Sequence, residues 1–203
     1  KPNLWNKMHD GFSKEQKIKI EKFIDLAVEF NKTHNIFSRN KERDVYNKDI
    51  LDCAPLTRHI KTKQTVLDLG SGGGFPGILL AITRPNNKIS LVESSKKKGY
   101  FLRKTKEDLC LTNVKIINKT INKKNTFGVF DVITARAFAN TKKILDITKQ
   151  NTHPKTKYLL LKGKKTTINK ELKDIDNKRY KCEIIKQDSK GFERNIVSIK
   201  INE

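Results

Sequence analysis

The spacing of apolar residues changes character after about residue 60. From Ser13 the apolar positions recur at helical intervals, and Ser13 and Gln16 have the spacing of a capping box, so an amphipathic helix is predicted there. The apolar positions of this segment are Ile20, Phe23, Ile24, Ala27 and Phe30. A second, short helix is expected from about Asn47 to Leu56, with Pro55 ending it.

Beyond residue 60 the sequence contains seven short β-rich runs. They are TVLDLG from Thr65, KISLVE from Lys88, VKII from Val114, FDVITA from Phe130, YLLL from Tyr158, CEII from Cys182 and IVSIKI from Ile196. The early runs are almost continuously apolar, as buried parallel strands are, with helical spacers at 77–83 and 96–109. The last two runs lack such a spacer and should form an antiparallel hairpin. The pattern therefore predicts an α/β, doubly wound, seven-stranded sheet that is mostly parallel, with N-terminal helices.

The chain of 203 residues is long enough for one compact unit, which we expect to be a core at 61–203 with a helical extension at 1–60 packed on it. No apolar run is long enough to cross a bilayer, and residues 1–10 lack the apolar core of a secretion signal. We therefore expect a soluble, cytoplasmic protein without a membrane partner.

Three cysteines occur, Cys53, Cys110 and Cys182, without a C-x-x-C pair or histidines at metal-ligand spacing. The sequence thus predicts neither a disulfide framework nor a metal site. We expect all three cysteines to be reduced residues of the core.

The charge is strongly positive: 44 Lys and Arg against 22 Asp and Glu give a formal +22. An AT-rich genome is one explanation of abundant lysine, but such drift would enrich glutamate as well. A nucleic-acid partner explains the excess of base over acid better.

The segment Leu67–Gly77, LDLGSGGGFPG, joins a predicted strand to a helix that should begin near Pro76. Glycines at 70, 72, 73 and 74 allow a sharp turn and a close approach of ligand to backbone, and the helix N-terminus offers free N–H groups. Glu93 ends the next strand, 21 residues after Gly72, where an acid accepts hydrogen bonds from a ribose diol. The arrangement predicts a nucleotide-like ligand.

Two cofactors fit this turn. Gly72-x-Gly74-x-x-Gly77 satisfies the dinucleotide fingerprint, which would bind a nicotinamide cofactor. However, Asp68 lies two residues before Gly70, and the resulting D-L-G-S-G-G-G resembles the first motif of S-adenosylmethionine enzymes, whose acid lies near the amino-acid end of the cofactor. S-adenosylmethionine is therefore favoured, with a nicotinamide cofactor as the alternative.

Motifs along nearly the whole chain resemble those of the bacterial ribosomal RNA small-subunit methyltransferase G family, also called glucose-inhibited division protein B. They are FNKTHNIFS, DILD, LDLGSGGGFPGILLAI, LVES, FLRK, TARAF, LLLKG and ERNIVSIK. The resemblance implies a class I (Rossmann-like) methyltransferase that methylates ring nitrogen 7 of a guanosine in the decoding region of the small-subunit (16S) RNA. It implies cofactor contacts by Gly70 and Phe75, a ribose contact by Glu93, an adenine site beside Ile121 and Asn122, and Arg136 in the reaction pocket.

The chain departs from the family pattern at two places. Lys48 and Asp49 precede Ile-Leu-Asp where the family usually has Arg-His, so the RNA or cofactor contact there is open. Asn122 stands where a glutamate is more typical, although an amide also bonds to the edge of an adenine.

The turn after the fourth predicted strand, Ala135–Phe138, reduces the number of base atoms that this enzyme could methylate. It lacks the Asn/Asp-Pro-Pro-aromatic sequence common in enzymes that methylate exocyclic amines, and no cysteine has an adjoining base to make it a nucleophile. A ring nitrogen with a free lone pair needs neither device. Arg136 is the predicted catalytic residue and is also expected to bind the cofactor, whereas Phe138 either stacks on the base or packs in the core.

Basic residues near the predicted strand ends are candidate RNA contacts, although each is also an ordinary solvated lysine: Lys162, the run Lys96, Lys97 and Lys98, and the pair Lys164 and Lys165. The expected partner is the small-subunit RNA or the small subunit, bound by a monomer. A methyltransferase for another base or a small molecule, an oxidoreductase, and a non-catalytic RNA-binding module are the competing functions.

Overall fold

The computed structural model describes residues 11–38, 41–187 and 193–202. Residues 1–10, from which the lack of a secretion signal is argued, lie outside this part. Within it, seven strands form one sheet in the order β3-β2-β1-β4-β5-β7-β6. The strands are β1 (Thr65–Leu69), β2 (Lys88–Val92), β3 (Val114–Ile117), β4 (Val132–Arg136), β5 (Lys157–Lys162), β6 (Tyr180–Gln187) and β7 (Arg194–Ile201).

The sheet confirms the predicted fold class. β1 pairs in parallel with β2 and β4, β2 with β3, and β4 with β5. β7 is antiparallel to β6, because the short connection between them permits only a hairpin, and it is also antiparallel to β5. The order reverses between β1 and β4, since the chain first adds strands on one side of β1 and then on the other.

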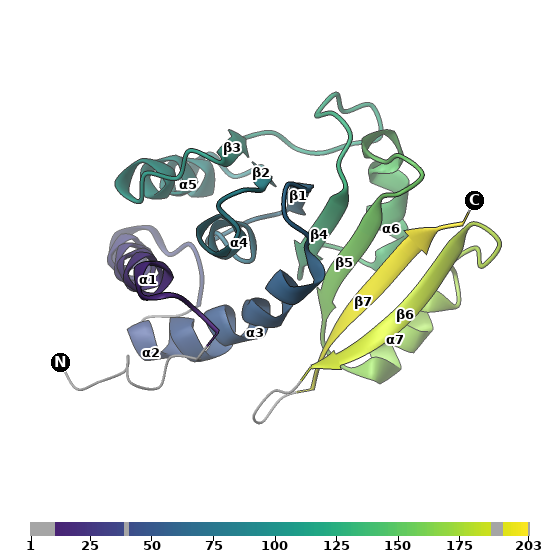
Figure 1. Cartoon of the computed structure of the whole chain (residues 1–203), viewed down its shortest axis with the longest axis horizontal. Coiled ribbons are helices and arrows are strands. Elements are labelled where there is room, and N and C mark those ends of the chain that lie inside the picture. Colours follow the sequence, from purple (N-terminus) through teal and green to yellow (C-terminus); the bar gives the residue numbers. More distant parts are fainter. Residues whose placement is uncertain (1–10, 39–40, 188–192, 203) are drawn as a thin grey trace.

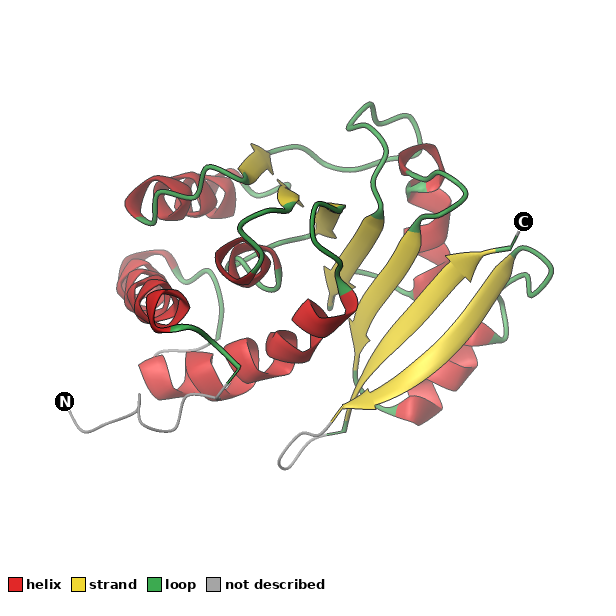
Figure 2. Ribbon diagram, viewed as in Figure 1, coloured by secondary structure: helices red, strands yellow, loops and turns green. Residues whose placement is uncertain are grey.

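Helices cover both faces of the sheet (Figures 1 and 2). One face packs against α4 (Gly77–Thr83), α5 (Lys96–Asp108) and the N-terminal helices, and the other against α6 (Thr141–Ile147) and α7 (Lys165–Leu172). Alternate residues of β1 show the division: Val66 belongs to the first hydrophobic cluster, and Leu67 and Leu69 belong to the second.

The N-terminal helix α1 (Lys14–His34) begins as predicted, because Ser13 Oγ accepts from the Gln16 N–H while Gln16 Oε1 accepts from the Ser13 N–H. Its apolar face buries Ile20, Phe23 and Ile24. These side chains belong to the same cluster as Val66 of the sheet, so the helix and the sheet share a core. The division into units at residue 60 stays a prediction.

The second helix is longer than predicted. Helical turns run without a break through α2 (Glu42–Val45), the π-helical η2 (Tyr46–Ile50), α3 (Leu51–Cys53) and the 3₁₀ helix η3 (Ala54–His59). The expectation that Pro55 ends this helix is wrong. Pro55 lies in the first turn of η3, where a missing N–H removes no hydrogen bond.

Candidate functional site

The carboxyl ends of β1 to β5 lie along one edge of the sheet, because these strands are parallel. The glycine-rich turn follows β1, Glu93 follows β2, Arg136 ends β4 and Lys162 ends β5. In open α/β sheets a ligand crevice forms at this edge, at the point where the strand order reverses. Here that point lies between β1 and β4.

The glycine turn has the backbone that the sequence predicts. Gly70, Gly72 and Gly74 have φ of 65°, 55° and 93°, values that favour glycine. A Cβ on Gly70 would lie 2.5 Å from the Phe138 ring, and one on Gly74 would lie 2.9 Å from Phe23. At Gly72 the nearest atom would be the Gly70 carbonyl oxygen at 3.7 Å, so of these three glycines Gly72 is the one where an added Cβ meets no clash. Gly70 and Gly74 thus serve packing, and Gly72 is the position where a ligand can approach the backbone.

Asp68 lies fully buried beneath this turn. Its Oδ2 accepts from the Gly77 N–H at 3.0 Å and so caps the first turn of α4. Its Oδ1 has no hydrogen-bond partner among the described residues. Burial raises the pKa of Asp68 to about 7, against the lowering effect of hydrogen bonds from Ser71 and Gly77. The residue therefore holds the turn to the helix and keeps one oxygen available as an acceptor.

Glu93 connects the end of β2 to the same turn. Its Oε2 accepts from the Gly72 N–H at 2.9 Å, and its Oε1 accepts from the Ser95 N–H at 2.8 Å. The side chain is buried, so these two bonds fix its carboxylate beside Gly72. Each oxygen still has a lone pair with which to accept a ribose hydroxyl.

Arg136 is held by two carboxylates of the N-terminal helical run. Its Nη2 lies 2.7 Å from Asp49 Oδ1, and its Nη1 lies 3.4 Å from Asp52 Oδ2. Burial acts to lower the pKa of Arg136, but these acidic neighbours raise it overall, so the guanidinium is cationic. It also lies 5.5 Å from the centre of the Phe75 ring, a cation–π contact. Phe75 is thereby packed between Arg136 and Phe23.

The predicted adenine-side residues lie in the helix-free connection between β3 and β4. Ile121 is buried in the second cluster, and Asn122 is exposed, with its Oδ1 accepting from the Lys124 N–H. The buried amides of Asn125 and Asn151 donate to each other, at 2.9 and 2.8 Å. Asn125 also donates to the Asn122 carbonyl oxygen, so this pair fixes the connection.

A family model described as rRNA small subunit methyltransferase G, GidB, matches residues 16–198. The ribosomal RNA small subunit methyltransferase G of Brachyspira hyodysenteriae is 37% identical over 186 residues, which cover 91% of this chain and 90% of the relative. That of Rickettsia bellii is 36% identical over 183 residues, covering 89% and 91%. The chain belongs to the rRNA small subunit methyltransferase G family. It is accordingly a methyltransferase, and S-adenosylmethionine is its cofactor.

Solved structures confirm the fold. A SAM-dependent methyltransferase from Aquifex aeolicus superposes with a TM-score of 0.64 at 14% identity, covering 86% of this chain and 98% of that one. A putative O-methyltransferase from Klebsiella pneumoniae gives 0.63 at 13% identity, covering 89% and 90%. The likeness is one of class I methyltransferase architecture.

The predicted RNA-contacting lysines fall into two groups in this member of the methyltransferase G family. Lys96, Lys164 and Lys165 are exposed at the starts of α5 and α7, which follow the carboxyl ends of β2 and β5 on either side of the β1/β4 pair, and exposed Lys97 donates to the His34 carbonyl oxygen. Lys162 differs: its side chain is 15% exposed and its amine bonds to Ala139 and Glu171 within the protein.

The cysteine prediction is correct only in part. Cys53 is buried, but Cys110 is exposed and Cys182 is half-buried, so the expectation that all three belong to the core is wrong. Cys110 lies in a left-handed turn (φ 51°) just past α5, where its side chain leaves the core. Burial raises the pKa of the Cys53 thiol, which is the opposite of an activated nucleophile.

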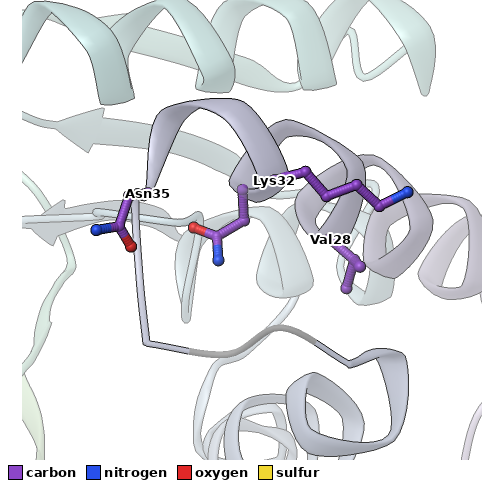
Figure 3. Close-up of a pocket in the computed structure, with 4 residues that line it drawn as sticks. Val28, Lys32 and Asn35 are labelled. Atoms are coloured by element: carbon purple, nitrogen blue, oxygen red, sulfur yellow. The ribbon is translucent and has the colours of Figure 1, made fainter.

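A cavity of about 350 Å³ lies at the C-terminal end of α1 (Figure 3). Its lining comes from Val28, Asn31, Lys32 and Asn35, none of which is a predicted site residue. Over the described ranges, no three His, Cys, Asp or Glu side chains are placed to hold a metal ion. No helix in that same part of the chain is long and apolar enough to span a membrane.

Sequence reasoning missed three acidic residues of the site. Asp49 and Asp52 bind Arg136 across 87 and 84 residues of sequence, and Glu171 binds Thr141 and Lys162. The DILD motif contains the first pair, and its neighbourhood was left open as an RNA or cofactor contact. The only signal in the sequence that could have pointed to Asp49 and Asp52 is that a buried arginine such as Arg136 needs carboxylate partners.

Proposed function

We propose that this chain transfers the methyl group of S-adenosylmethionine to ring nitrogen 7 of a guanosine in small-subunit (16S) ribosomal RNA. Membership of the methyltransferase G family supports the reaction. The observation that carries the site is the meeting of the glycine turn, Glu93 and Arg136 at the point where the strand order reverses. The relatives' names give the small-subunit RNA as substrate.

The residues present fit the cofactor. Gly72 leaves open space where a side chain would otherwise stand, and Glu93 is fixed beside it with acceptor capacity for a ribose diol. The buried Asp68 Oδ1, which lacks a partner in the described part of the chain, is an acceptor for the amino-acid end. Gly70 and Phe75 shape the turn, while Ile121 and Asn122 contribute the adenine side.

S-adenosylmethionine supplies an electrophilic methyl group, which the free lone pair of a guanine ring nitrogen accepts without prior loss of a proton. The protein therefore needs to align the guanine nitrogen with the methyl group and to exclude water from both, and no general base is required. Arg136, fixed by Asp49 and Asp52, supplies a positioned positive charge beside the crevice for a phosphate or the cofactor carboxylate.

Exposed lysines on both sides of the crevice suit a polyanionic substrate. Lys96 and Lys97 flank it from α5, and Lys164 and Lys165 from α7, so phosphates on either side of the target base have basic partners. We further propose that the enzyme acts as a monomer on the RNA or the small subunit, in the cytoplasm where that substrate is found.

Transfer of a tritiated methyl group to small subunits and to free small-subunit RNA tests the proposal. Labelled RNA is then reduced with borohydride and cleaved with aniline, a treatment that cuts at 7-methylguanosine. We expect one labelled cleavage site. Label that resists this cleavage would place the methyl group on another atom, and label found only on small molecules would exclude RNA as the substrate.

A further inference from the structure

The turn that follows β4 has a conformation that its own sequence does not favour. Ala137 has a φ of 52°, a left-handed value that costs free energy for a residue with a Cβ. The next residue, Phe138, contacts Gly70, where an added Cβ would lie 2.5 Å from the ring. Something outside the turn must therefore hold it against the glycine-rich loop.

Lys162 is one of the groups that hold it. The amine at the end of β5 donates to the Ala139 carbonyl oxygen at 2.8 Å and lies 2.9 Å from Glu171 Oε2. The side chain is 15% exposed, far less than a solvated lysine. Its charge is directed into the protein.

Glu171 of α7 completes the arrangement. Its Oε2 accepts from the Thr141 N–H at 2.9 Å and from the Thr141 hydroxyl at 2.7 Å, as well as from Lys162. Burial acts to raise the pKa of Glu171, but the hydrogen bonds from Thr141 and Lys162 outweigh it and lower the pKa overall. The carboxylate thus fixes the start of α6 and the lysine together.

We propose that Lys162 and Glu171 are positioning residues for methyl transfer, which act by holding residues 137–141 so that Phe138 stays against Gly70 and Arg136 keeps its place at the crevice. Lys162 then makes no contact with RNA phosphate, unlike the exposed Lys164 two residues later. The proposal rests on the proposed function, since the reaction that it supports is transfer to RNA.

Two substitutions test this role. Lys162→Met removes the charge and both bonds at similar length, and Glu171→Gln keeps the shape but removes the carboxylate. Each should lower the single-turnover methyl-transfer rate at saturating RNA and cofactor by about tenfold or more, through lost alignment. The double variant should be no slower than the slower single variant, because the two residues act as one unit.

RNA binding gives the readout that separates positioning from phosphate contact. In Lys162→Met the slope of log affinity against log salt should equal that of the wild type, whereas Lys164→Met should reduce it by about one. Lys155→Met, an exposed lysine before β5 at the opposite edge of the sheet, should change neither the rate nor the slope. All rates are measured well below each variant's melting temperature, so that lost stability alone does not lower them.

Unchanged rates in folded Lys162→Met and Glu171→Gln would overturn the positioning role, and so would a reduced salt slope in Lys162→Met. If Lys162→Met does not fold, the isosteric Glu171→Gln decides by the same rate. The wild-type protein is the reference: no transfer to RNA by the wild type would contradict the proposed function and the inference with it. An active wild type with equally active variants would contradict the inference alone.

Discussion

Asp68 has no exposed surface, so its ionisation contributes to the stability of the whole fold. Its pKa in the folded protein is about 7, whereas an unfolded chain ionises near pH 3.9. Between these values the folded protein binds a proton that the unfolded chain releases. The free energy of unfolding must therefore fall as the pH rises through this window, by an amount on the order of 4 kcal/mol at most.

Asp68→Asn should remove this dependence. An amide oxygen can still accept from the Gly77 N–H, but it never ionises, so the variant should gain stability relative to the wild type as the pH rises from about 4 to 8. Urea unfolding across this range measures the difference. Asp131→Asn is a control with the opposite sign: partial burial acts to raise the Asp131 pKa, but bonds from Thr65 and His153 outweigh it and lower the pKa overall. The wild type should therefore lose stability relative to Asp131→Asn as the pH falls below about 4, so the control is followed to that lower range. A wild-type-to-variant difference that is constant with pH would refute the account of Asp68.

Gly72 has a backbone conformation that favours glycine and also lies where the cofactor is proposed to approach the backbone. Gly72→Val puts a β-branched side chain at a φ of 55° and fills the open space beside Glu93, so binding of S-adenosylhomocysteine should be abolished. Calorimetry gives the affinity. Gly163→Ala, at a glycine with no nearby atoms and no positive φ, should bind as the wild type does. Wild-type affinity in folded Gly72→Val would mean that the cofactor binds elsewhere.

The sequence predicts a site residue when the order of strands along the chain alone determines its position. Gly72 and Glu93 follow from strand order, since both stand at the ends of neighbouring parallel strands. Asp49 and Glu171 do not, because their partners depend on how separate helices pack against the sheet edge. For the same reason Lys162 looked like an RNA contact in the sequence, while the structure turns its amine inward.

The helical run from α2 to η3 is the element that links the N-terminal segment to the site. Its sequence predicts a short helix, but Pro55 lies at the start of a new 3₁₀ turn and so permits the run to continue to His59. The π-helical turn Tyr46–Ile50 contains Asp49, and α3 contains Asp52. Such turns often occur at functional sites, and here this one brings a carboxylate to Arg136.

The ion pair between this run and β4 should be measurable in stability. Asp49→Ala leaves a mostly buried guanidinium with one fewer partner and should lower the free energy of unfolding by about 2–4 kcal/mol. Combined with Arg136→Ala, the loss should be clearly smaller than the sum of the two single losses. Urea unfolding of the four proteins gives the cycle. Additive losses would show that the two residues do not interact energetically.

At the scale of the whole molecule, the mostly parallel, seven-stranded sheet with its C-terminal hairpin could be predicted, because alternating strands and helices allow few topologies. The formal net charge of +22 also follows from the sequence, but the distribution of that charge over the surface does not. The structure places exposed lysines at the starts of α5 and α7, which follow β2 and β5 on either side of the β1/β4 pair.

The charge predicts a contrast between two ligands. Affinity for small-subunit RNA should fall steeply and log-linearly from about 50 to 200 mM salt, because lysine–phosphate contacts release counterions, while affinity for S-adenosylhomocysteine should hardly change. Filter binding and calorimetry give the two slopes. An RNA affinity that does not change over this range would mean that the excess of Lys and Arg over acidic residues does not serve RNA binding.

The identity of the acceptor atom is the central claim, and replacing that atom tests it most directly. Small-subunit RNA transcribed with 7-deazaguanosine has a C–H group in place of ring nitrogen 7 and so lacks the lone pair. Both this RNA and the ordinary transcript, free and assembled into subunits, are incubated with the enzyme and tritiated S-adenosylmethionine, and competition binding verifies that the enzyme binds them equally. We predict label in the ordinary RNA and none in the 7-deaza RNA; equal labelling of both would contradict methylation at nitrogen 7.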